Sequence, residues 1–221
     1  MAYRRTENVV RRLAARQDAI VAAARDAAGE GGMMAVQIAP VAARAGIAAG
    51  TVYRYFPGKT DLVGALIASV SEREIDMVRR AADAAPGPLS ALAAALTTFA
   101  ARALRRRKLA WAVIAEPVDP EVEAVRLRYR KELTAEIETR IRAAIDGAHL
   151  PEPDASLSAP AVVGALLEGL VGPLAPDVGD DPARAKEAVQ ALTLIALRGL
   201  GVVDARARGL VVQTAMPAEA T

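Results

Sequence analysis

The stretch AARAGIAAGTVYRYFPGK, residues 42–59, decides the fold that this chain is expected to adopt. Gly46 is the residue type that most readily ends a helix in the left-handed backbone conformation. Ala42 and Ala45 are small enough for two helices to cross closely, and Val52 is an apolar position that can hold the second helix against its neighbours. The stretch therefore predicts a helix-turn-helix, whose second helix is offered to the major groove of DNA.

Polar side chains that can reach DNA follow the predicted turn. Hydroxyl groups, a guanidinium and an ammonium can meet phosphates and base edges without being buried. They are supplied by Thr51, Tyr53, Arg54, Tyr55 and Lys59. Three of the seven aromatic residues of the chain also fall within residues 53–56. Packing alone does not explain this clustering in so aromatic-poor a chain, which indicates a DNA-reading element.

Helical patterns extend on both sides of this stretch. A first helix is predicted to end at the glycines of residues 29–32, and two short helices at about 38–45 and 48–55. The stripe of the first helix is Val10, Leu13, Gln17, Ile20, Val21, Ala24 and Ala28. Gly58 can then cap a helix that runs to about Ala85. At 1.5 Å per residue this helix spans ~40 Å, enough to tie one domain to another.

The second part of the chain has the longer helices expected of a bundle. Three- and four-residue spacing indicates a buried seam made of Leu89, Leu92, Leu96, Phe99 and Ala103. Asp119 and Pro120 form a strong helix start. The stripe of that helix is expected to be Val122, Val125, Tyr129, Leu133, Ile137, Ile141 and Ile145. A buried helix within 159–175 and a final helix opened by Asp181 and Pro182 precede a loosely held tail, residues 201–221.

The composition favours an all-α protein and excludes several kinds of chemistry. Alanine, the strongest helix former, supplies 52 of the 221 residues, and aromatic residues make up only 3%. There is no cysteine and one histidine, His149, which excludes a thiolate nucleophile and a cysteine- or multi-histidine metal site. His149 lies at an expected helix end, where it is more often a dipole-facing group than a catalytic one. We expect no enzyme activity, no metal and no cofactor.

Charge and hydropathy indicate a cytoplasmic protein with an anionic partner at its N-terminal end. Residues 1–59 carry nine basic and four acidic residues, although the whole chain has a net charge of only +2. The absence of cysteine fits a reducing compartment, and no targeting segment is visible. The most apolar run, 159–175, contains Glu168 and is marginal in length for a membrane span, so no membrane is expected as a partner.

Each of two basic clusters has two possible interpretations. The arginines within residues 4–12 could form an arm that reaches DNA or a solvated terminus. The cations of residues 105–108 end a helix, where the helix dipole favours them. Their alternative role is a site for an anionic ligand or an acidic partner.

A specific set of residues lies between positions 10 and 66. It consists of Glu30, Gly31/Gly32, Val41-Ala42, Ala45-Gly46-Ile47, Gly50-Thr51-Val52-Tyr53-Arg54-Tyr55-Phe56, Lys59 and Leu62. The set resembles the N-terminal domain of the TetR family of bacterial transcriptional regulators. The resemblance implies a three-helix helix-turn-helix domain followed by a helical bundle that binds a ligand and dimerises, with about nine helices in all.

The resemblance also implies roles for individual positions. Phosphate contacts are implied at Thr51, Tyr53, Tyr55 and Lys59, and base-edge contacts at Ala49, Gly50 and Arg54. Phe56 is similar to a buried aromatic of the family. The chain departs from the family pattern at Gln37 and Ala48, which replace a capping threonine and a capping serine, and a missing cap costs ~0.5–2 kcal/mol. Gln37, Arg44 and Ala48 complete the candidate DNA-binding set.

The leading hypothesis is a one-component regulator, a repressor released by a small apolar or amphipathic effector. Residues 1–58 would bind a palindromic double-stranded operator, and residues 59–200 would bind the effector and dimerise. An effector in the bundle would displace the long helix and change the separation of the two DNA-reading heads. The candidate pocket residues are Met77, Phe99, Trp111 and Tyr129, each with a core role as its alternative.

A homodimer through the last two long helices is expected, because the penultimate helix is apolar on nearly all sides. Its small residues are Gly164, Ala165, Gly169 and Gly172. A central core helix is the alternative. For the whole chain, the alternatives are a helical small-molecule carrier or enzyme with a vestigial helix-turn-helix, and a structural DNA binder without a ligand.

Overall fold

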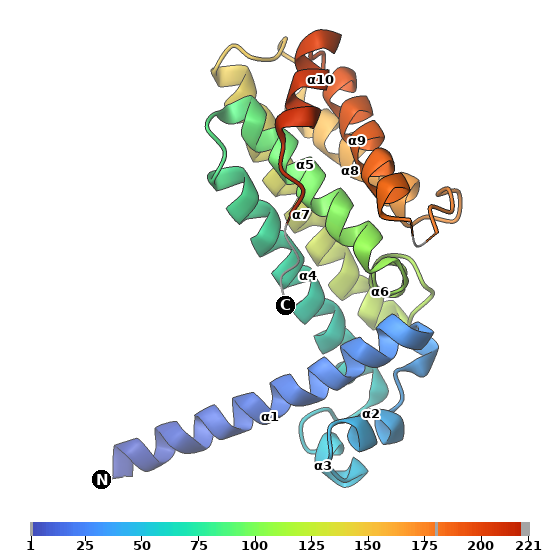
Figure 1. Ribbon diagram of the computed structural model, residues 1–221. Coiled ribbons are helices and arrows are strands. Elements are labelled where there is room, and N and C mark those ends of the chain that lie inside the picture. Colours follow the sequence, from blue (N-terminus) through green and yellow to red (C-terminus); the bar gives the residue numbers. More distant parts are fainter. Residues whose placement is uncertain (1, 180, 218–221) are drawn as a thin grey trace.

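The chain folds into helices joined by short loops (Figure 1). The computed structural model describes residues 2–179 and 181–217, with side chains from residue 7 onward. Within these ranges there are ten α-helices, one 3-10 turn and no strand, so the predicted all-α class is confirmed with one helix more than expected.

The helices of the N-terminal part are α1 (Ala2–Gly31), α2 (Ile38–Arg44), α3 (Ala49–Tyr53) and α4 (Lys59–Asp83), with the 3-10 turn η1 (Met33–Ala35) after α1. The remaining helices are α5 (Pro88–Arg105), α6 (Arg107–Ile114), α7 (Pro120–Asp146), α8 (Ala155–Leu170), α9 (Pro182–Gly199) and α10 (Asp204–Gln213). Helices α1 to α3 gather at one end of the molecule, and α4 leads from them into the bundle (Figure 1).

A first hydrophobic core holds α1, α2 and α3 together. Ile20, Val41, Val52 and Phe56 are buried in it, so Phe56 is the core residue that the sequence predicted. The first half of α1 is different: it projects away from the other helices (Figure 1), and Val10 is 59% exposed. The predicted stripe of α1 is therefore buried only from Ile20 onward, because none of the described helices lies beside its N-terminal half.

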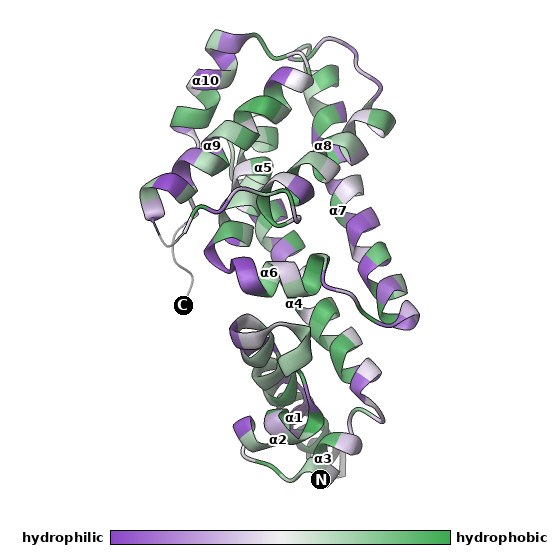
Figure 2. Ribbon diagram, turned by 90° about the vertical axis from the view of Figure 1, so that its right-hand side faces the viewer, coloured by the Kyte–Doolittle hydropathy of each residue, from purple (hydrophilic) through white to green (hydrophobic). Residues whose placement is uncertain are grey.

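A second, larger core fills the bundle of α4, α5, α7, α8, α9 and α10. Helix α4 contributes to both cores, through Leu62 and Leu66 to the first and through Ile75 and Val78 to the second. Helix α6 lies between the two groups, as the turned view in Figure 2 shows, and it packs against α1. The two parts of the molecule are thus joined by α4 and by α6.

The predicted helix starts are present, with one difference at Asp119. Asp181 caps α9 by accepting a hydrogen bond from the Ala183 backbone N–H (2.9 Å), and Gly58 precedes α4. Asp119 stands at the N-cap of α7, but its carboxylate accepts a hydrogen bond from the Thr60 hydroxyl (3.2 Å). Asp119 therefore links α7 to the start of α4 instead of capping its own helix by a side-chain hydrogen bond.

The predicted stripe of α7 differs from the buried one at two positions, since Ala144 is buried in place of Ile145 and Arg126 in place of Val125. Arg126 is 6% exposed and lies between the buried Val122 and Tyr129, whereas Val125 is only partly buried. The arginine is tolerated in the interior because backbone carbonyl groups of α6 and the following loop accept its N–H groups.

The expected loose tail also needs correction. Asp204–Gln213 forms α10, which packs on α9 and α5 and buries Ala207 and Val211. Apolar residues four positions apart supply one face for this helix, and Asp204 pairs with Arg208 on the other side (2.9 Å). Residues 218–221 of the predicted tail lie outside the described part of the chain.

Helix α8 is buried on one face only. Val163 and Leu166 face the bundle core, but Leu157 is 70% exposed and Gly164 and Ala165 are also exposed.

Among the described residues, no helix is both long enough and apolar enough to cross a membrane.

Candidate DNA interface and ligand cavity

The turn between α2 and α3 has the geometry that the sequence predicted. Gly46 has φ +66°, the left-handed conformation in which glycine is not strained. The Ile47 N–H donates to the Ala42 carbonyl (3.0 Å), which closes the turn. Ala42 and Val52 are fully buried at the crossing of the two helices, so α3 is held rigidly with its opposite face outward.

The predicted DNA-binding residues differ in exposure, and Ala49 and Tyr55 pack partly against the first core. Ala48, Gly50, Tyr53, Arg54 and Lys59 are exposed, and Gln37, Ala49, Thr51 and Tyr55 are half-buried. The Tyr53 side chain is large and still 53% exposed, which is unusual for an aromatic residue in a chain with so few of them. A hydroxyl, a guanidinium and an ammonium are therefore exposed on α3, in the loop after it and at the first residue of α4.

The first turns of α2 and α3 lack side-chain caps. Gln37 is the N-cap of α2, but its amide N–H₂ donates to the Met34 carbonyl (3.0 Å) and does not cap the helix. Ala48 is the N-cap of α3 and has no polar side chain. Neither Gln37 nor Ala48 therefore replaces the side-chain cap that the family pattern has at its position.

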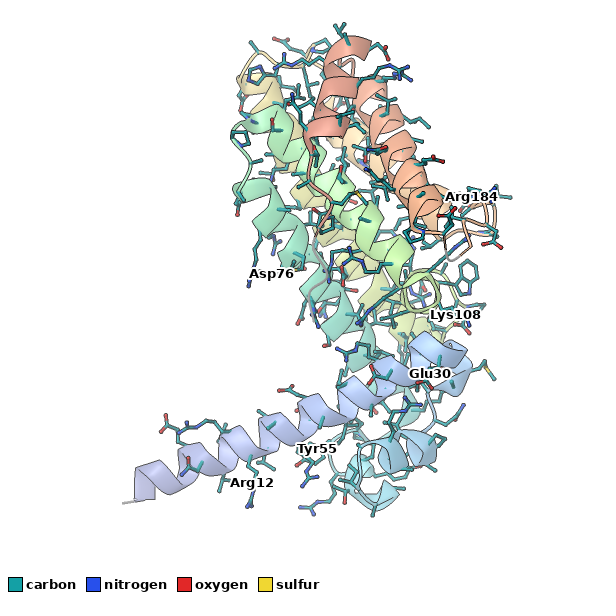
Figure 3. All side chains as sticks on the ribbon, viewed as in Figure 1. Arg12, Glu30, Tyr55, Asp76, Lys108 and Arg184 are labelled. Atoms are coloured by element: carbon teal, nitrogen blue, oxygen red, sulfur yellow. The ribbon has the colours of Figure 1, made fainter. Side chains whose placement is uncertain are left out.

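Arg44 has a partner within the protein. Its guanidinium donates to both carboxylate oxygens of Glu30, at 2.7 and 2.5 Å, and joins α2 to the C-terminal end of α1. Figure 3 shows Glu30 at this end of α1. The hydrogen bond from Arg44 holds the pKa of Glu30 below its usual range. Contact of Arg44 with DNA would have to compete with this pair.

Replacing Gly46 tests the turn directly. We expect Gly46→Ala to lower the free energy of unfolding by about 1 kcal/mol, because an alanine is strained at positive φ. No heavy atom beyond the adjacent residues lies within 4 Å of the new Cβ, so the cost is conformational only. Gly46→Asn is the matched control, since asparagine adopts this conformation more readily. Equal urea midpoints for the two variants would contradict the prediction.

A cavity of about 540 Å³ lies in the bundle beside the junction with α1 to α3. It is enclosed mainly by α4, α5, α6 and α7, and its volume is in the range of small-molecule sites. Phe99 and Tyr129 line it, whereas Met77 and Trp111 do not. The Tyr129 hydroxyl donates to the Glu72 carboxylate, and burial raises the pKa of Tyr129.

The cavity is in contact with the residues that hold the N-terminal helices. Leu109 and Val113 of α6 line it and are also part of the first core. Just after α6, the Glu116 carboxylate accepts a hydrogen bond from the Met33 backbone N–H (2.8 Å). Gly32, with φ +71°, brings the backbone close enough for this contact. Sequence reasoning missed Glu116, because nothing local relates it to a turn 83 residues earlier.

Arg126 fixes the end of α6 at the same place. Its guanidinium donates to the carbonyls of Val113 (2.7 Å), Ala112 (3.1 Å) and Glu116 (2.9 Å), and it pairs with Glu123 (2.8 Å). Burial lowers the pKa of Arg126. The carbonyl groups at this helix end are therefore satisfied by a side chain that also lines the cavity.

The fold defines a helix-turn-helix domain followed by a helical bundle. Residues 20–66 match the family described as "Bacterial regulatory proteins, tetR family". This segment is therefore similar to the tetR family, as the resemblance implied. No curated protein sequence matches the chain.

Solved structures share the fold over nearly the whole chain at low sequence identity. RolR (NCGL1110) in complex with the ligand resorcinol is 19% identical, with a TM-score of 0.68 over 95% of this chain and 98% of that one. The fatty acid degradation regulator FadR from Bacillus halodurans is 21% identical, with a TM-score of 0.72 over 85% and 97%. A TetR/AcrR-family regulator from Thermobifida fusca is 21% identical, with a TM-score of 0.67 over 83% and 97%.

Proposed function

We propose that the protein is a dimeric transcriptional repressor that leaves its operator when a small molecule fills the cavity. One observation carries this proposal: a single helix connects the cavity to the DNA-reading helices. Helix α6 lines the cavity, and α6 and the loop after it hold the DNA-reading helices. Residues 1–58 would read DNA and residues 59–200 would bind the effector and dimerise. A cytoplasmic protein without enzyme activity fits this role.

The DNA contacts would come from the outward face of α3 and its flanks. Thr51, Tyr53, Tyr55 and Lys59 would bind phosphates, and Ala49, Gly50 and Arg54 would meet base edges. Gln37, Arg44 and Ala48 would lie at the margin of this contact, with Arg44 held by Glu30 in the absence of DNA.

Release would follow from differential binding of the effector. An effector that fits the cavity in only one position of α4 and α6 shifts the population toward that position. Both helices reach the first core, and Asp119 and Glu116 add polar links from the bundle to Thr60 and Met33. Two recognition helices must lie ~34 Å apart, or a multiple of it, to bind one face of DNA, so a small rotation prevents simultaneous docking.

The dimer would form through α8 and α9. Their outward sides carry Leu157, 70% exposed, and Ile195, 58% exposed, beside the exposed Gly164 and Ala165. Small residues allow close approach of a second copy, and a two-fold axis presents the same patch on both subunits. A palindromic operator matches that symmetry.

Selection of bound DNA from a random-sequence library by the full chain, followed by footprinting on the DNA around its own gene, tests the proposal. We expect an enriched inverted repeat, and an affinity that falls steeply with salt because several phosphates are contacted. Absence of any enriched sequence at low salt would contradict it. Such a result, combined with tight ligand binding, would favour a helical carrier.

A further inference from the structure

The cavity has a basic rim and an apolar floor. The floor is formed by buried side chains, among them Ile75, Leu109, Val113 and Leu133. Among the residues that the structure describes, seven arginines line the cavity but only one acidic residue, Glu74, does. The arginines are Arg25, Arg73, Arg102, Arg105, Arg106, Arg126 and Arg130. The net charge of the whole chain is only +2, but the residues that line this apolar cavity carry a local excess of positive charge.

Structural roles account for only some of these arginines. Arg102 pairs with Glu74 (Arg102 Nη2 to Glu74 Oε1, 2.8 Å), and Arg126 clamps the end of α6. Arg25 lies against Asp26, at 3.2 Å. Arg105 donates to the Pro217 carbonyl (2.7 Å). The carboxylate of Glu74, which lines the cavity, is already paired with Arg102.

Three lining arginines have no acidic partner in the part of the chain that the structure describes. They are Arg73 on α4, Arg106 between α5 and α6, and Arg130 on α7. All three are exposed and also line the cavity, as expected of side chains at its rim. Arg130 makes only a long contact with the Ile114 carbonyl, at 3.5 Å.

We propose that the effector is an amphipathic organic anion, with a single carboxylate or sulfonate head at the arginine rim and an aryl or alkyl body on the floor. The inference rests on the proposed function and names the chemical class of its effector. A cleft lined by one sign of charge concentrates the opposite ion, and guanidinium groups bind such heads by charge-assisted hydrogen bonds. The apolar floor excludes a ligand that is charged over its whole length.

Binding of a matched pair of fluorescent probes to the full chain tests this inference. 8-Anilinonaphthalene-1-sulfonate carries the anionic head, and N-phenyl-1-naphthylamine has the same rings without it. We expect the triple variant Arg73→Gln, Arg106→Gln, Arg130→Gln to weaken sulfonate binding by at least ~10-fold, the effect of one hydrogen bond to a charged group. Binding of the neutral probe should change by less than about 2-fold, since the floor is untouched.

Arg80→Gln is the matched control. Arg80 lies on α4, two turns beyond Arg73, does not line the cavity, and makes an exposed pair with Asp76. It should leave both affinities unchanged. The three single variants, checked by circular dichroism, replace the triple variant if that variant does not fold. Decanoate should compete with the sulfonate probe more strongly than decan-1-ol does.

The outcomes separate this inference from the proposed function. Equal weakening of both probes in the triple variant, no weakening of either, or no binding of either probe to the wild-type chain overturns the anionic effector. A selective weakening of the sulfonate probe supports it, even if the DNA selection described above finds no operator. Operator binding combined with equal weakening of both probes leaves the regulator standing and removes the anionic effector.

Discussion

The double variant Tyr53→Ala, Lys59→Ala is expected to bind the selected operator at least ~100-fold more weakly than the wild type. Both side chains are exposed, on α3 and at the start of α4, where they are free to meet phosphates. A hydrogen bond to a charged group contributes about 1.5–3 kcal/mol, and the double variant removes two such bonds at each half-site of a dimer. Fluorescence anisotropy at fixed salt measures the change, and the salt slope should fall by about one for each phosphate group that is no longer bound.

Stability separates this effect from misfolding. Because both residues are exposed, the free energy of unfolding should change by less than about 0.5 kcal/mol. Lys131→Ala, which removes an exposed charge from α7, should leave operator binding unaltered. Tyr53→Phe keeps the ring and removes the hydroxyl, so its operator affinity shows how much of the loss comes from the hydroxyl and how much from the ring. Unchanged operator affinity in the double variant would show that the interface has been placed wrongly.

The DNA-reading end could be predicted from the sequence because its determinants are local. Gly46 is needed for a left-handed turn between its immediate neighbours, and Val52 and Phe56 are buried at helical spacing. Residues within about ten positions of one another are enough to specify such a motif.

The link between the cavity and the helices α1 to α3 could not be predicted, because the residues that form it are distant in the chain. The Glu116 carboxylate meets Met33, and no pattern around either residue indicates the other. Side-chain size alone also did not identify the cavity residues: Phe99 and Tyr129 line the cavity, whereas Trp111 does not, although other residues of its helix α6 do. Which large side chain borders a cavity depends on the packing of four helices, which is fixed only in the folded chain.

A charged residue on a buried stripe is a signal that was available in the sequence. Arg126 follows Val122 by four positions and precedes Tyr129 by three, the spacing of a helix face that enters the core. Val125 is apolar and fits the same stripe, but it is only partly buried. A long side chain can instead enter the core when carbonyl groups at a helix end accept its N–H groups.

The variant Arg126→Met should show how much this arginine stabilises the junction. Three carbonyl groups at the end of α6 would be left without their donor, and we expect the free energy of unfolding to fall by about 3 kcal/mol, since each buried unsatisfied group costs ~1–3 kcal/mol. Arg142→Met, which removes an exposed pair with Glu138 on the same helix, should cost less than about 0.5 kcal/mol.

Hydrogen exchange distinguishes a local effect at α6 from general weakening of the fold. Arg126 holds the segment that carries Glu116, so its removal should free the last turn of α6 and speed exchange there more than in α9. Operator affinity should fall as well, because Met33 and the helices after it are no longer held in a fixed position. Urea midpoints equal to those of Arg142→Met, or faster exchange spread evenly over the bundle, would contradict the role of Arg126 as the clamp between the cavity and the DNA-reading helices.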